Sequence, residues 1–113
     1  MTLLRSSALL SFGVGARASL VIVPGILVGP LVVHRPLHGQ DWMISHGPSG
    51  LAVYSLFATR AAALSCAAEL VALAPGFWAS EQTSVANCPE RPQILDAIRR
   101  WLPERYRGSV ATA

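Results

Sequence analysis

The order of apolar and polar residues is clearest in the middle of the chain, where it predicts a β-hairpin. Residues 41–46 and 51–57 are rich in apolar and aromatic side chains, and a turn-forming segment at residues 47–50 (Gly-Pro-Ser-Gly) separates them. Both faces of the second strand carry apolar residues, so we expect a sheet that is covered on both sides.

The hairpin leads into a predicted helix over residues 59–73, whose beginning and end both carry known signals. Thr59 is a favourable N-cap residue, and Ala-Pro-Gly at residues 74–76 ends the helix. At helical spacing, five apolar side chains share one face of this segment: Ala63, Leu64, Ala67, Leu70 and Val71. The alanines on this face permit close packing on a sheet.

A second helix is predicted over residues 92–102, after a polar, loop-like segment at residues 79–89. Pro92 suits the first turn of a helix, and Pro103 ends it. The apolar stripe of this helix consists of Ile94, Leu95, Ile98, Trp101 and Leu102. We expect this stripe to pack on the rest of the fold.

The first third of the chain has two interpretations. Its longest uncharged run, residues 18–33, contains 16 residues, fewer than the roughly 20 that a membrane-spanning helix needs. The run is interrupted by proline and glycine, and it divides into two strands over residues 20–23 and 31–34 with a turn at Pro24-Gly25. We favour buried strands and keep a membrane segment over residues 8–33 as the alternative.

These elements define an α+β fold in a single domain over residues 1–113. We expect a small antiparallel sheet of about four strands with the two helices, 59–73 and 92–102, packed on one face. We expect residues 1–19 and 108–113 to be poorly ordered, and the second of these segments carries no structural signal.

The composition adds an excess of apolar residues. Hydrophobic residues make up 52% of the 113 residues and charged residues 13%, which is more apolar than an ordinary soluble domain and excludes a disordered chain. A protein partner, self-association or a membrane would explain the excess. Cys66 and Cys88 have no secretory context, so we expect free thiols and a cytoplasmic location, with inner-membrane association as the alternative.

The hairpin and its helix resemble a known group of proteins. The resemblance is carried by Trp42-Met-Ile-Ser-His46, Pro48-Ser-Gly50, Phe57-Ala-Thr59 and the alanine-rich helix to Leu73. It is a resemblance to small, mostly uncharacterised proteins of bacterial plasmids, integrative elements and phages, and it covers roughly a third of the chain. It implies a mobile-element neighbourhood and brings no catalytic residues with it.

Metal binding and nucleophilic catalysis have little support. His34 and His38 have ligand-like spacing, but Pro36 disfavours the helix on which such a pair is specific. Ser45 and His46 cannot form a hydrogen-bonded pair, because neighbouring residues on a strand point to opposite faces. A chain without lysine also lacks a Walker-type phosphate loop. We therefore expect no metal ligands, no cofactor and no catalytic residues, and we interpret His46 as a local hydrogen-bonding residue of the hairpin.

Arginine is the only basic residue type in the sequence. Nine arginines against six acidic residues give a net charge of +3, which is too small to imply nucleic acid by itself. Four arginines are candidate contacts with a partner or with nucleic acid: Arg99, Arg100, Arg105 and Arg107. We expect a non-enzymatic accessory protein of a mobile element that binds a protein partner. Nucleic-acid binding through these arginines and membrane anchoring by residues 8–33 are the alternatives.

Overall fold

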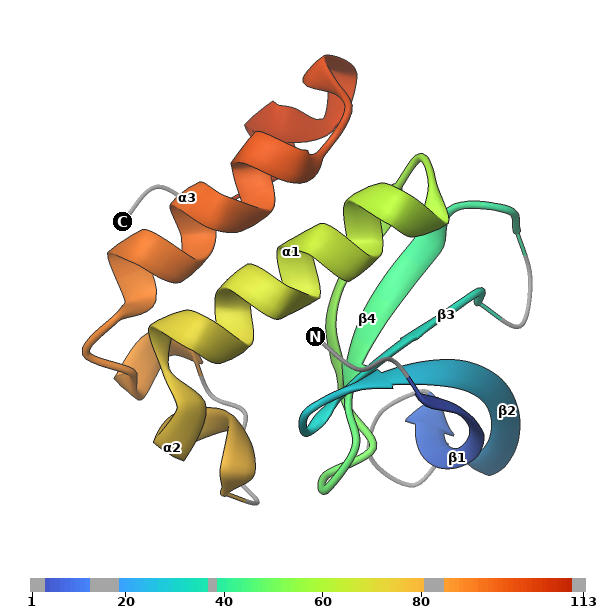
Figure 1. Cartoon of the computed structure of the whole chain (residues 1–113). Helices are drawn as coiled ribbons and strands as arrows, with labels where there is room; N and C mark the ends of the chain where they lie inside the picture. Colours follow the sequence, from blue (N-terminus) through green and yellow to red (C-terminus); the bar gives the residue numbers. More distant parts are fainter. Residues whose placement is uncertain (1–3, 13–18, 37–38, 81–84, 111–113) are drawn as a thin grey trace.

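The computed structural model describes residues 4–12, 19–36, 39–80 and 85–110, which form one sheet and a layer of helices (Figure 1). The sheet has five antiparallel strands in sequence order: β1 (Leu4–Phe12), β2 (Ser19–Val28), β3 (Leu31–His34), β4 (Trp42–His46) and β5 (Ala52–Phe57). The helices are α1 (Arg60–Leu73), α2 (Pro75–Ala79) and α3 (Arg91–Trp101), with short 3-10 helices η2 (Val85–Asn87) and η3 (Glu104–Ser109).

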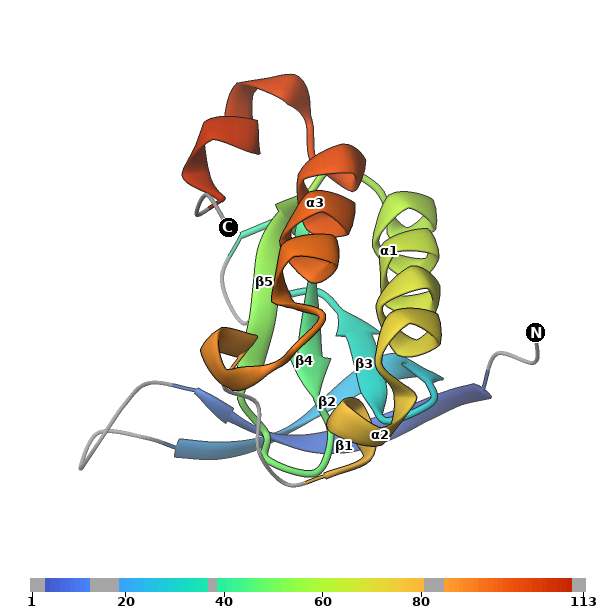
Figure 2. The same ribbon diagram turned by 90° about the vertical axis from the view of Figure 1, so that its left-hand side faces the viewer.

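Both long helices lie on the same side of the sheet. Helix α1 crosses β3 and β4, and α3 runs antiparallel beside α1 (Figures 1 and 2). The expected α+β fold with two helices on one face is therefore confirmed, and the sheet has one strand more than expected. Helix α1 ends at the predicted residue, and α3 begins and ends one residue earlier than predicted.

The predicted hairpin and helix form for the expected reasons. In the turn between β4 and β5, the Gly50 N–H donates to the His46 carbonyl at 2.8 Å, and Gly50 has a φ of 74° that favours glycine. At the start of α1, the Thr59 hydroxyl accepts a hydrogen bond from the Ala62 N–H at 3.1 Å. This bond satisfies one of the backbone donors that a helix start leaves without an intrahelical partner.

Strand β5 departs from a regular ladder. Between the pairs Trp42–Phe57 and Ser45–Ala52, β4 advances by three residues and β5 by five. The surplus residues are the mark of β-bulges, which increase the local twist of an edge strand. Leu56 lies in this stretch with a φ of 76°, a conformation that is rare for a residue with a branched, bulky side chain. The outer edge of β5 is therefore a poor template for another strand.

Strand β2 continues through the segment that the sequence predicts as a turn. Pro24 and Gly25 pair with β1, so this prediction is wrong, and the chain reverses instead at Gly29-Pro30. Proline fits here because β3 pairs only with Ile26–Val28, so the missing N–H removes no bond to β3. Glycine fits because a Cβ at residue 25 would lie 2.6 Å from Val32 Cγ1.

Strands β1 and β2 form a long hairpin that extends beyond the rest of the sheet. All nine residues of β1 pair with β2 in one continuous register, whereas β3 borders only three residues of β2. Figure 2 shows this hairpin at a steep angle to β3, β4 and β5. Poor order is expected from the sequence over residues 1–19, yet residues 4–12 form β1; residues 1–3 and 13–18 lie outside the described residues.

The main core lies between the helices and the sheet. Its largest fully buried side chains include Trp78, Phe57, Leu31, Ile44, Leu70 and Ile94. Val110 is 5% exposed and belongs to the same core. Residues 108–110 therefore depart from the poor order expected over residues 108–113, and residues 111–113 lie outside the described part of the chain.

The face of the sheet opposite the helices is also buried in β3 and β4. Val32 and His34 of β3 and their partners Ser45 and Met43 of β4 are all buried. Among the side chains that the structure describes, Leu51 is the one large apolar residue that is exposed. Most of the large apolar side chains in this part of the chain are thus buried or partly buried. Within the described residues, no helix has the length and apolar character needed to cross a membrane.

Candidate binding site

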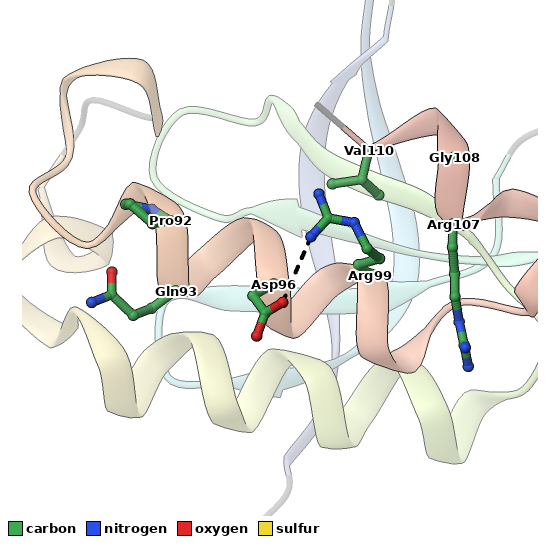
Figure 3. A pocket seen from close by; sticks show the side chains of 7 residues that line it. All are labelled: Pro92, Gln93, Asp96, Arg99, Arg107, Gly108 and Val110. Atoms are coloured by element: carbon green, nitrogen blue, oxygen red, sulfur yellow. Dashed lines mark ion pairs between the residues drawn. The ribbon is translucent and has the colours of Figure 1, made fainter. Parts of the chain in front are cut away.

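A shallow hollow lies between α3 and η3 (Figure 3). It has a volume of about 600 Å³, and its lining residues are Pro92, Gln93, Asp96, Arg99, Arg107, Gly108 and Val110. The four residues from α3 are spaced so that they share one face of that helix. A smaller hollow of about 210 Å³ shares Asp96, Arg99 and Arg107 with the first and adds Arg100.

Two of the candidate arginines are held by carboxylates. Arg99 lies 3.6 Å from Asp96 on the same helix, the ion pair drawn in Figure 3. Arg100 donates to both oxygens of Glu69 on α1, at 2.7 and 2.9 Å, and lies 3.6 Å from Asp96. Both bonds come from Nη1, and they hold the Arg100 guanidinium between α1 and α3. Its exposure to solvent limits what the pair contributes to stability.

The other two candidate arginines lie on η3 and differ from each other. The Arg107 Nε–H donates to the Leu102 carbonyl at 3.2 Å, which holds the side chain at the end of α3. The Arg105 guanidinium lies 4.7 Å from the centre of the Tyr106 ring and does not line either hollow. The structure thus brings Arg99, Arg100 and Arg107 together and leaves Arg105 apart.

The arginines border the hollow without converging on a single point. In Figure 3 the Arg99 guanidinium points toward Val110, while the Arg107 guanidinium extends in the opposite direction. Pro92 adds exposed apolar surface, Val110 lines the hollow although it is largely buried, and Asp96 adds a negative charge beside Arg99. Such a surface suits an extended ligand with separated anionic groups better than a single compact phosphate.

His46 joins the hairpin turn to α2. Its Nε2 lies 2.6 Å from the Trp78 carbonyl oxygen, and a carbonyl only accepts, so Nε2 carries the proton. Its Nδ1 therefore accepts from the Ser49 hydroxyl at 2.8 Å. The predicted local hydrogen bond of His46 is confirmed. The contact with Trp78 joins residues 32 apart in the sequence, and no local pattern indicates it.

His34 makes a similar pair on the other face of the sheet. Its Nδ1 donates to the Arg35 carbonyl at 2.7 Å, so its Nε2 accepts from the Ser45 hydroxyl at 2.8 Å. His34 is fully buried, and burial lowers the pKa of its imidazole despite the opposing hydrogen bond to Arg35. Ser45 and His46 thus bond to different partners, as their opposite directions on the strand predict.

The hydrogen bonds from Ser49 to His46 and from His46 to the Trp78 carbonyl connect these groups as a nucleophile, a base and an orienting group are connected in a catalytic triad. Acyl transfer at Ser49 would also need N–H groups directed at a developing oxyanion. The two N–H groups that follow Ser49 are engaged: that of Gly50 donates to the His46 carbonyl, and that of Leu51 donates to the Ser49 hydroxyl. The contacts of this group are those of a hydrogen-bonded hairpin turn.

The thiols are free and poorly suited to chemistry. Burial, reinforced by Glu69, raises the pKa of Cys66 to about 12. Burial and a hydrogen bond to Glu90 raise the pKa of Cys88 as well, so both remain protonated near neutral pH. Across the residues that the structure describes, no group of three or more His, Cys, Asp or Glu side chains could hold a metal ion. His38, whose ligand-like spacing from His34 the sequence analysis discounts because of Pro36, lies outside the described residues.

Two residues of the site were not predicted from the sequence. Glu69 binds Arg100, and Val110 lines the larger hollow. Glu69 reaches Arg100 across 31 residues of sequence, because α1 and α3 pack side by side. Val110 follows a polar stretch that resembles a frayed end and carries no periodic signal. Only the tertiary arrangement of α1, α3 and η3 reveals these contributions.

Comparisons with protein-family models, with curated proteins and with solved structures find no match for this chain. The geometry described above is therefore the basis on which a function is inferred.

Proposed function

We propose that this protein is a non-enzymatic binding protein that recognises an acidic, extended segment of a partner protein at the hollow between α3 and η3. The observation that carries the proposal is the grouping of Arg99 and Arg107 around the larger hollow, which also has apolar lining, with Arg100 in the smaller hollow that shares both of them. Separated guanidinium groups match the spacing of carboxylates along an extended peptide. Pro92, which is exposed, offers a contact to a small apolar side chain between those carboxylates.

A protein ligand is favoured over nucleic acid by the alternation of charge. Asp96 lies between Arg99 and Arg100, and Glu69 engages Arg100. These carboxylates interrupt the positive surface that a phosphate backbone requires over several contacts. Arg105, which would extend the positive surface, stacks on Tyr106 away from the hollow. A peptide that carries its own polar groups tolerates such a mixed surface.

The role of an accessory protein of a mobile element is part of this proposal. It rests on the resemblance of residues 42–73 to small proteins of plasmids, integrative elements and phages. The engaged N–H groups around Ser49 support a binding role over a hydrolytic one.

Fluorescence anisotropy tests the proposal with a labelled peptide in which glutamates alternate with small apolar residues. We expect the full chain to bind this peptide. Changing Arg99→Ala and Arg107→Ala together should weaken binding roughly fivefold or more, since two charge contacts of about 0.5–1 kcal/mol each are lost. Arg60→Ala is the matched control, because Arg60 is exposed on α1 and lines neither hollow.

The same assay distinguishes the alternatives. A single-stranded oligonucleotide of equal charge that binds more tightly than the peptide, and loses binding steeply with salt, would replace the protein partner with nucleic acid. Absence of peptide binding, or equal weakening by the Arg60→Ala control and the double variant, would remove the α3–η3 hollow as the site.

A further inference from the structure

The two edges of the sheet differ in a way that points to a second binding surface. Strand β5 ends the sheet on one side, and its bulges and the left-handed Leu56 spoil that edge for further pairing. Strand β1 ends the sheet on the other side with a continuous nine-residue register. In the part of the chain that the structure describes, no strand pairs with the outer edge of β1.

Strand β1 lacks the features that normally protect an edge strand. Its sequence, Leu4 to Phe12, contains no proline, no lysine and no bulge, and its one charged residue is Arg5. From Ser6 onward, β1 pairs with a part of β2 that has no strand partner on its other side among the residues that the structure describes. This part is a two-stranded ribbon, a structure that is marginal in water without further strands.

We propose that β1 is a dimerisation strand, which pairs antiparallel with β1 of a second copy of this chain. The pairing is self-complementary, as a two-fold symmetric interface requires. The register that pairs all nine residues is centred on Ala8, which then faces Ala8 of the second copy. It places Leu4 opposite Phe12, and it places Arg5 opposite Ser11, so the charged residues do not face each other.

This register explains why the second copy is favoured as the occupant. Strand β1 is continuous and free of bulges, so a second β1 can pair along its whole length, and this register places no like charges opposite each other. Each two-stranded ribbon becomes part of a four-stranded one. The surface is separate from the α3–η3 hollow, so the two proposals are independent.

Sedimentation velocity of the full chain, at concentrations from about 1 to about 100 µM, tests the dimer. We expect a concentration-dependent dimer for the unmodified chain. Ala8→Lys and Ala8→Glu each place like charges across the axis and should each give monomers. An equimolar mixture of the two variants should dimerise again, because opposite charges then meet. Ala61→Lys, an exposed site on α1, should remain dimeric.

Three outcomes would overturn the proposal: a monomeric unmodified chain throughout this range, Ala8 variants that remain dimeric, or variants that are folded by circular dichroism and do not associate when mixed. The register has its own test. Ala8→Cys should form an interchain disulfide on oxidation, whereas Leu10→Cys, which faces Ser6 of the second copy, should not. Failure of the Ala8→Cys chain to cross-link overturns the pairing. Peptide binding at the α3–η3 hollow should be unchanged in the Ala8 variants.

Discussion

Two buried histidines, His34 and His46, lie on opposite faces of the sheet, and each is paired with a serine. In both, a backbone carbonyl accepts from one ring nitrogen and so determines that the other nitrogen accepts from the serine hydroxyl. The burial of two polar rings is acceptable here because both nitrogens of each ring are satisfied. Each histidine thus serves the fold as a buried ring with both nitrogens hydrogen-bonded.

The lowered pKa of His34 makes the stability of the fold depend on pH. The unfolded chain binds the imidazole proton more tightly than the folded protein does, near the ordinary pKa of 6.5. The free energy of unfolding should therefore be unaffected by His34 well above pH 6.5, should decrease as the pH falls below it, and should level off below the folded pKa.

Urea unfolding at pH values from about 7.5 down to about 5 measures this dependence. His34→Asn retains hydrogen-bonding groups but does not titrate, so its stability should change less over the same interval, even if it is lower throughout. An equally steep loss of stability in the variant would show that His34 is not responsible.

Strand β2 shows that a residue pattern typical of a turn can lie inside a continuous strand. Pro24-Gly25 has the chemistry of a turn, yet both residues lie within a continuous strand. Proline is tolerated because β3 does not extend that far, and glycine is required because Val32 of β3 lies so close. Neither reason is visible before the strands are placed side by side.

The contact at Gly25 leads to a test of the strand. Gly25→Ala should destabilise the protein by about 1–3 kcal/mol, because the new methyl group would meet Val32 Cγ1 at 2.6 Å and the Val33 carbonyl oxygen at 3.2 Å. Gly76→Ala is the control, since a Cβ there meets no atom within 4 Å, and it should be neutral or stabilising by up to about 1 kcal/mol. Chemical denaturation of both variants gives the comparison, and equal effects would contradict the close approach of β2 and β3.

Elements with local signals were predicted well, and those defined by distant contacts were not. The Thr59 cap and the glycines of the β4–β5 turn act on residues within a few positions, so the hairpin and α1 could be placed from the sequence. Strand β1 was not predicted from the sequence, and the structure forms it by pairing with β2. For the site, the arginines were found from their clustering, whereas Glu69 and the separation of Arg105 depend on packing.

At the scale of the whole molecule, Trp78 connects parts that are distant in sequence. Its indole N–H donates to the Leu70 carbonyl of α1 at 2.7 Å, and its own carbonyl accepts from His46 of β4. Because the ring is fully buried in the core, these bonds are shielded from water. Trp78 therefore fixes α2 against both the long helix and the sheet.

Removal of the Trp78 indole should be costly, and Trp101 offers a matched comparison. Trp78→Phe removes the indole donor to the Leu70 carbonyl, which keeps its bond from the Ala74 N–H, and leaves a gap in the core, which together should cost about 2–4 kcal/mol. The indole nitrogen of Trp101 is buried without a hydrogen-bond partner, so Trp101→Phe should cost less, since no bond is lost. Thermal and urea unfolding compare the two, and a larger loss in Trp101→Phe would contradict the assigned role of Trp78.

The simple order of the sheet has a consequence for the way the chain folds. Every strand pairs with the strand before it, so the ladder requires only short loops to close, which favours rapid formation. The core between α1 and the sheet, by contrast, is completed by Ile94, Ile98, Leu102 and Val110. During synthesis the sheet and α1 are thus made before the residues that cover them. Until the last of these residues leaves the ribosome, the nascent chain exposes an apolar helix face that a chaperone can hold.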